Sequence, residues 1–209
     1  MNKLIFALLM LPCVVFGQLV PFNKVPTKRD YILAKKYDQC YNSHRYNAKQ
    51  RRAFTPFSKA ITIKLISFHV PIDGALPGEE NPPPYTPIAP DNFKINNERI
   101  IESKVLSEIA IDSLTDIMYN VGFTPMKIKP KFTIADSGAS CYNPRNAILF
   151  IDANGVLTHY IEFCWECGRY YLSSSKIKNT TYCEQKLDML KTFFLTQGIK
   201  YGTILPKKG

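Results

Sequence analysis

The sequence of 209 residues has too little charge for a disordered chain and too few cysteines for a small disulfide-held scaffold. Charged residues make up 21% and aromatic residues 12%, whereas disordered chains combine high net charge with few aromatic residues. Six cysteines are sparse beside the density of such scaffolds. Phosphate-cradling glycine loops, dinucleotide fingerprints and nucleophile elbows are also absent from the sequence. One ordinary globular domain is therefore expected, without a motif that assigns a reaction.

Long apolar runs are also scarce, because only Leu4–Phe16 forms one, directly after the positive start Met1–Lys3. Its thirteen residues fall short of the roughly 20 that an apolar helix needs to span a bilayer. A signal peptide at residues 1–17, cleaved near Gly17, explains the run better than a membrane anchor does. We therefore predict an exported protein of the periplasm or the extracellular space, with no transmembrane segment in the mature chain.

Acidic residues are scarce between residues 24 and 59, where only Asp30 and Asp38 accompany ten lysines and arginines. The net charge of this segment is +8, whereas residues 60–209 carry sixteen basic and fifteen acidic groups. Residues 18–59 are therefore expected to form a basic N-terminal segment, in which aromatic residues are interleaved with the cations. This combination fits an anionic surface or polymer as partner, held by ion pairing and by stacking.

The candidate anion-binding residues are Lys28, Arg29, Lys35, Lys36, Arg51, Arg52 and, further along the chain, Arg145. The alternative for the segment is that its charges form a solvated face while its tyrosines pack on the body of the protein. The alternative for Arg145 is that it satisfies backbone carbonyls or a carboxylate at the end of the sheet. No motif that reads a nucleic-acid groove accompanies the basic run, so no specific nucleic-acid partner is predicted.

Residues 60–209 are predicted to form a single α+β domain. Alternation of apolar and polar residues from Ala60 to about Val70 is typical of a half-buried strand. Seven prolines between residues 71 and 90 exclude a helix or a central strand, so a proline-rich loop is expected at 71–95.

Two helices are expected in this domain. Over 107–121, apolar residues recur at three- and four-residue spacing behind Ser107, which is placed to cap the helix start. Over 181–197, a second apolar face follows Thr181 and Glu184, which have the spacing of a capping box.

Three further strands are expected, at about 126–134, 146–152 and 156–163. The last two flank Asn154-Gly155, the strongest short sequence signal for a β-hairpin. Strands packed with two helices, without regular alternation of strand and helix, predict an α+β fold around an antiparallel sheet.

Five cysteines remain after the signal peptide, an odd number for an oxidising compartment. Cys164 and Cys167 follow the second hairpin strand, and Cys141 precedes the first. Because hairpin pairing brings the start of one strand beside the end of the other, these three are expected at one end of the sheet. Cys183, in the first turn of the predicted last helix, is expected to join them, and Cys40 is left isolated.

Three kinds of site fit this four-cysteine cluster. Structural disulfides fit the compartment and would join the hairpin to the last helix. Zinc fits the two-residue spacing of Cys164 and Cys167, although the gaps of 22 and 15 residues to the other two cysteines match no standard finger. Thiol redox chemistry would benefit from a lowered pKa of Cys183 near a helix start. However, the 42 residues after Cys167 are too few for a thioredoxin-like fold.

The half of the domain at 135–201 resembles small exported proteins of Gram-negative bacteria that have no assigned function. The resemblance is carried by Cys141-Tyr-Asn-Pro-Arg-Asn-Ala-Ile-Leu-Phe, by Tyr160-Ile-Glu-Phe-Cys-Trp-Glu-Cys167 and by the closing Cys183-Glu helix. It implies a bacterial origin and a periplasmic or secreted location, and it transfers no activity.

Two functions are therefore expected as alternatives. The first is an exported binding or structural module, with the cysteine cluster stabilising the sheet end and no catalytic residue or cofactor. The second is a thiol-redox or zinc-dependent enzyme that uses Cys164 and Cys167 together with Cys141 and Cys183.

Overall fold

The computed structural model describes residues 25–69, 86–89, 92–132 and 142–204. The predicted signal peptide and Cys141 lie outside these residues. Within them the helices are α1 (Lys28–Asp38), α2 (Ala48–Arg52), α3 (Glu108–Tyr119) and α4 (Lys186–Thr196), with the short 3₁₀ turns η1 (Phe57–Lys59) and η2 (Asn97–Arg99). The strands are β1 (Cys40–Asn42), β2 (Thr62–Phe68), β3 (Ile100–Val105), β4 (Val121–Phe123), β5 (Asn146–Ile151), β6 (Leu157–Cys164) and β7 (Arg169–Leu172).

The strands form two antiparallel sheets, so the predicted α+β fold is confirmed. The larger sheet has the order β3-β2-β5-β6-β7, and the smaller one pairs β1 with β4. Because β1 lies near the start of the described chain and β4 follows α3, this small sheet joins the basic segment to the α+β body.

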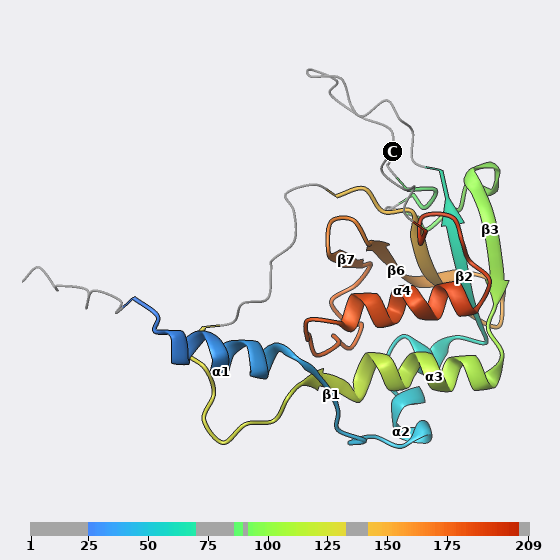
Figure 1. Cartoon of the computed structure of the whole chain (residues 1–209). Coiled ribbons are helices and arrows are strands. Elements are labelled where there is room, and N and C mark those ends of the chain that lie inside the picture. The colour runs from blue at the N-terminus through green and yellow to red at the C-terminus, as the bar shows by residue number, and fades with distance from the viewer. Residues whose placement is uncertain (1–24, 70–85, 90–91, 133–141, 205–209) are drawn as a thin grey trace, which may run out of the picture.

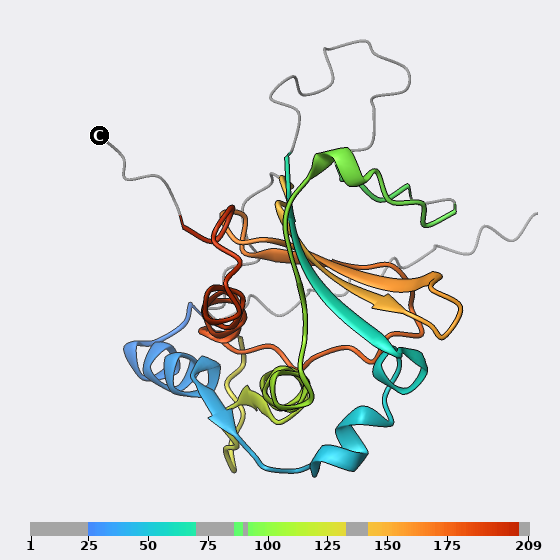
Figure 2. The same ribbon diagram turned by 90° about the vertical axis from the view of Figure 1, so that its right-hand side faces the viewer.

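The large sheet is covered on both faces (Figures 1 and 2). Helices α3 and α4 pack on one face, where Leu114 and Phe194 belong to the main hydrophobic core. Residues 86–89 and 92–99 lie on the other face, where Ile88 is fully buried in a second, smaller core. Helices α1 and α2 lie outside the layer of α3 and α4 (Figure 2). None of the helices in the described ranges combines the length and apolar character needed to cross a membrane.

The most regular sequence patterns give the predicted elements. The alternation after Ala60 becomes β2, and Ser107 caps α3 through its side chain, which accepts a hydrogen bond from Ala110 N. The predicted hairpin is β5–β6, in which Gly155 adopts a φ of 76°, a conformation that favours glycine.

The strand predicted at about 126–134 is wrong for the residues described, which extend to Phe132. Residues 124–132 form no strand, and β4 lies just before them. The alternation there includes Pro130, and Ile128 is 74% exposed, so the pattern finds no sheet on which to bury an apolar face. Instead, this segment runs beside α1, where the ring centroids of Tyr31 and Phe132 lie 5.2 Å apart.

The last helix is confirmed, but it starts at Lys186 with Gln185 as N-cap and without the predicted capping box. Other contacts fix the residues just before α4. Glu184 N donates to Asp38 O, and Cys183 is disulfide-bonded. Contacts with the end of α1 therefore decide where α4 begins.

Candidate functional site

Disulfides account for the four cysteines that the structure describes. Cys40 is bonded to Cys183, and Cys164 to Cys167. The prediction that Cys40 is isolated is therefore wrong, and Cys183 does not join the CxxC pair. The cause is the pairing of β1 with β4, which carries Cys40 to the residues before α4, where Cys40 N donates to Gln185 Oε1.

The CxxC pair spans the last residue of β6 and the turn that leads to β7, and it is buried. Cys164 and Cys167 are each 1% exposed, and Asn143 N lies 3.4 Å from Cys164 Sγ. Thiol exchange needs a sulfur that an attacking thiolate can reach, so the burial favours a structural role. In the described ranges, His, Cys, Asp and Glu form no group of three or more that could hold a metal ion.

Three of the seven candidate anion-binding residues are engaged within the chain. Arg51 is 6% exposed and pairs with Asp112 and with Asp116, which fixes α2 on α3. Arg52 pairs with the exposed Glu108. Arg145 pairs with Glu166 at 3.3 Å, as its alternative interpretation expected.

The other four candidates, Lys28, Arg29, Lys35 and Lys36, are exposed on α1. Residues 124–132 run along this helix. At one end, Thr124 N donates to Tyr37 O, and at the other Phe132 packs on Tyr31. This segment contributes three more exposed cations, Lys127, Lys129 and Lys131. The seven side chains are called the cationic face below.

Carboxylates do little to neutralise the cationic face. In the two segments that form it, Asp30 is used in the capping box of α1, where it accepts from Thr27 N and Thr27 Oγ1. These hydrogen bonds lower the pKa of Asp30, with smaller contributions from the charges of Lys131 and Arg29. Asp38 is 2% exposed and lies away from solvent. The face therefore presents a strong positive charge to solvent.

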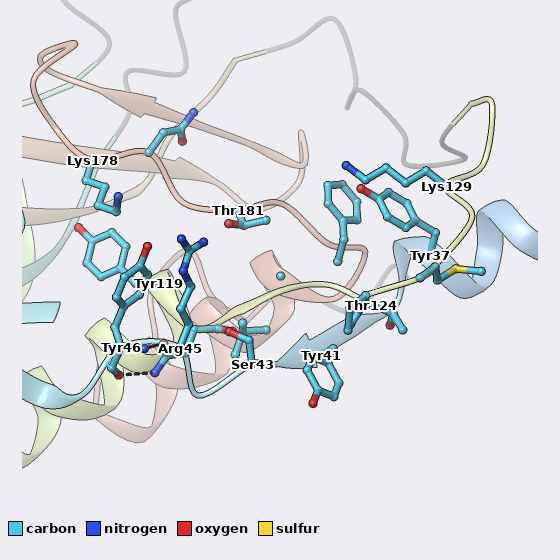
Figure 3. Close-up of a pocket in the computed structure, with 17 residues that line it drawn as sticks. Tyr37, Tyr41, Ser43, Arg45, Tyr46, Tyr119, Thr124, Lys129, Lys178 and Thr181 are labelled. Carbon is cyan, nitrogen blue, oxygen red and sulfur yellow. Dashed lines mark hydrogen bonds between the residues drawn. The ribbon is translucent and has the colours of Figure 1, made fainter. Parts of the chain in front are cut away.

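A pocket of about 470 Å³ adjoins this face. Tyr37 and Lys129 lie at one end of it, and Arg45, Tyr46 and Tyr119 lie at the other (Figure 3). Strand β4 and Lys178, Asn179 and Thr181 also contribute to the lining. Gly122 permits their close approach, because a Cβ at this position would lie 2.7 Å from Thr181 Cγ2. The pocket is thus formed where the small sheet meets the chain before α4.

Arg45 and Lys178 both lie against the ring of Tyr46 at one end of the pocket. Arg45 Cζ is 5.1 Å from the centroid of the Tyr46 ring, and Lys178 Nζ is 5.7 Å from it. Lys178 Nζ also lies 4.4 Å from the centroid of Phe54. Such contacts hold a cation by its attraction to the ring face. They leave its charge without a counter-ion.

The residues that line the pocket include Arg45, Lys129 and Lys178 but neither aspartate nor glutamate. No ion pair joins these three to a carboxylate of the described residues. The pocket is therefore positively charged and lined by aromatic rings. An anion fits these electrostatics better than a neutral or cationic ligand does.

Tyr119 lines the pocket, but its hydroxyl is closed to solvent. This last residue of α3 is 6% exposed, and its hydroxyl is buried with no hydrogen-bond partner among the described residues. Burial raises the pKa of Tyr119, so the hydroxyl keeps its proton at neutral pH. A buried polar group without a partner is costly, but because this oxygen is closed to solvent, a ligand in the pocket does not reach it in this structure.

Sequence reasoning missed Arg45, Lys178 and Tyr119 as site residues. Arg45 and Tyr119 give no local signal, because the first is one cation among ten in its segment and the second belongs to the apolar side of α3. Lys178 lies more than 130 positions from Tyr46 in the sequence and meets it only through the fold. Comparison of the chain with family models, with curated proteins and with solved structures gives no match.

Proposed function

We propose that this protein is an exported binding module that attaches to an anionic lipid surface through the cationic face. The observation that carries the proposal is the group of seven exposed cations on α1 and residues 124–132. In these two segments Asp30 is the only carboxylate that is not buried, and it is engaged in the cap of α1. Two disulfides support the exported location, because disulfides persist in oxidising compartments.

Exposed apolar side chains in the same parts of the chain favour a lipid surface over a soluble polyanion. Ile32 on α1 is 60% exposed, Ile128 in residues 124–132 is 74% exposed, and Val25, just before α1, is 85% exposed. At a bilayer surface such side chains enter the boundary between head groups and acyl chains while the lysines contact anionic head groups. A hydrophilic polymer gives them no such environment.

The experiment is co-sedimentation of the mature protein with phosphatidylcholine vesicles that contain increasing amounts of phosphatidylglycerol. Binding is expected to rise with phosphatidylglycerol and to weaken with added salt. Each lysine near an anionic membrane contributes about 1 kcal/mol, so Lys35→Ala/Lys36→Ala should weaken binding by roughly thirtyfold. Lys104→Ala/Lys176→Ala, which removes the same charge outside the cationic face, is the control and should leave affinity within about threefold.

Apolar substitutions separate a lipid surface from a polymer. Ile32→Ser/Ile128→Ser should weaken vesicle binding and leave binding to heparin, a sulfated polysaccharide, unchanged. The proposal is wrong if the two lysine pairs have equal effects. It is also wrong if the serine variant binds vesicles as the unmodified protein does, an outcome that would indicate a soluble polyanion as partner.

A further inference from the structure

The pocket beside the cationic face has the size and chemistry of a small-molecule site. Its volume of about 470 Å³ lies within the range of roughly 300–1,000 Å³ that is usual for such sites. Four tyrosines, Tyr37, Tyr41, Tyr46 and Tyr119, line it together with Arg45 and Lys178 (Figure 3). Attachment to a membrane through surface charges does not require such a cavity. The pocket therefore indicates a separate ligand.

The charges indicate the anionic group of this ligand. Arg45 and Lys178 both lie within 6 Å of the Tyr46 ring centroid, so two positive charges share one end of the pocket. A dianion such as phosphate neutralises both. Arginine binds phosphate through its planar fork and lysine binds it as a point charge, so this pair combines the two common modes of phosphate recognition.

The remainder of the lining indicates what carries the phosphate. Tyrosine presents an apolar ring and a polar hydroxyl together. Asn179 accepts a hydrogen bond from Tyr170 through its side-chain oxygen, which leaves its amide hydrogens as donors, and Thr181 contributes a further hydroxyl. A sugar ring, whose surface alternates C–H and O–H groups, matches such a lining better than a purely apolar body does.

We infer that this pocket binds a phosphorylated sugar, either as a free molecule or as the head group of a lipid in the surface to which the cationic face attaches. Only the second of these sources depends on the proposed membrane attachment. In both, Arg45 and Lys178 hold the phosphate, and Tyr46 and the residues around Asn179 contact the sugar.

Calorimetric titration tests the inference with glucose 6-phosphate, inositol 1-phosphate, inorganic phosphate and glucose as probes. At least one sugar phosphate should bind tenfold or more tightly than inorganic phosphate and than glucose. Equal affinity for inorganic phosphate would reduce the pocket to a simple anion site and overturn the inference. It is also overturned if neither sugar phosphate binds.

Two substitutions test the residues. Lys178→Met should reduce the affinity for the sugar phosphate by tenfold or more, whereas Lys176→Met, two positions away and outside the pocket lining, should leave it unchanged. Arg45→Met should also reduce it by tenfold or more, because it removes the other cation at this end of the pocket. Unchanged affinity in both variants contradicts the assignment.

The two sources of the ligand and the two sites are separable. Lys35→Ala/Lys36→Ala should weaken vesicle binding but not the calorimetric affinity for the sugar phosphate. Lys178→Met should weaken that calorimetric affinity but not the binding to phosphatidylglycerol vesicles. If the ligand is a lipid head group, the protein prefers phosphatidylinositol to phosphatidylglycerol vesicles, and excess inositol 1-phosphate removes that preference. If the ligand is a free molecule, the protein binds both kinds of vesicle equally, and the sugar phosphate still binds in the calorimetric titration.

Discussion

Cys40 and Cys183 form a disulfide between residues that are 143 positions apart in the chain. Hydrogen bonds accompany it on both sides, since Cys40 N donates to Gln185 Oε1 and Glu184 N donates to Asp38 O. The bond thus joins the end of α1 to the start of α4, directly beside the small sheet that contributes to the pocket.

Removal of this disulfide is expected to be the most damaging cysteine change. A cross-link that closes a long loop removes much conformational entropy from the unfolded chain. Cys40→Ala/Cys183→Ala should therefore lower the free energy of unfolding by about 3–5 kcal/mol, measured by urea denaturation of the oxidised proteins.

The matched control is Cys164→Ala/Cys167→Ala, because that disulfide spans a sequence separation of only 3. Its removal should cost less than the removal of the long-range bond. Equal losses in the two variants would contradict the entropic explanation.

Arg51 and Arg52 are neighbours in the sequence but should respond very differently to substitution. Arg51 is buried and donates to Thr115 Oγ1 and to Tyr46 O, and it pairs with two aspartates. Removing one partner of a buried charge network leaves the other groups uncompensated. Arg51→Ala should therefore lower the free energy of unfolding by about 3–5 kcal/mol.

Arg52→Ala provides the comparison, because Glu108, its partner, has a side chain that is 77% exposed. Exposed ion pairs contribute about 0–1 kcal/mol, so this variant should unfold close to the unmodified protein in the same denaturation experiment. A large loss on Arg52→Ala, or a negligible one on Arg51→Ala, would contradict the structural roles assigned to them.

Local patterns in the sequence were sufficient for much of the fold. Helix α3 follows from its apolar spacing and from Ser107, and the β5–β6 hairpin follows from Asn154-Gly155, because in both cases the determinants lie within a few residues. The strand predicted at about 126–134 failed since its pattern depended on a partner strand that the fold does not supply. A pattern of period two describes a surface, not the neighbour that covers it.

The sites were less accessible to sequence reasoning because they depend on distant pairs. The sequence contains nothing that distinguishes Arg51, which enters the α2–α3 interface, from Arg52 beside it. The partner of Cys40 depends on the pairing of β1 with β4, two strands of three residues each that are too short to give a pattern. The basic character of residues 24–59 was visible, but Lys127, Lys129 and Lys131 join it only through packing beside α1.

Glu162 is expected to make stability depend on pH. It is 3% exposed on β6, and Tyr142 Oη lies 3.3 Å from its Oε2. Burial raises the pKa of Glu162 to about 7, while hydrogen bonds from Thr86 and Tyr142 act in the opposite direction. Between its ordinary pKa of 4.5 and about 7, the folded protein holds a proton that the unfolded chain has lost. This contribution to stability is complete below pH 4.5 and is lost as the pH rises through 7.

Glu162→Gln keeps the shape of the side chain and removes the titration. At pH 8 the variant should be more stable than the unmodified protein by about 1–3 kcal/mol, and the difference should shrink as the pH falls to 4.5. Glu98→Gln, at an exposed position, serves as the control. Chemical denaturation at a series of pH values measures both, and a difference independent of pH would exclude this account of Glu162.

Lys186 should give a pH dependence of the opposite sign. Its side chain is buried, and Nζ donates to the carbonyl oxygens of Ile117 and Met118 in the last turn of α3 and of Val121 at the start of β4. Lys186→Met leaves these acceptors buried without their donor, which should cost about 2–4 kcal/mol. The pKa matters as well, because burial lowers it to about 7 from 10.5, against the opposing charge of Asp116.

The sign follows from the protons bound in each state. Between pH 7 and 10.5 the unfolded chain carries a proton on Lys186 that the folded protein has released, so its contribution to stability increases with pH across this window and is lost as the pH falls through 7. The stability difference between the unmodified protein and Lys186→Met should therefore widen from pH 7 to pH 10 in chemical denaturation. Lys191→Met, on the same helix, should show no such widening. If the Lys186→Met difference stays constant instead, the surrounding carbonyls hold Lys186 in its charged form across the whole range.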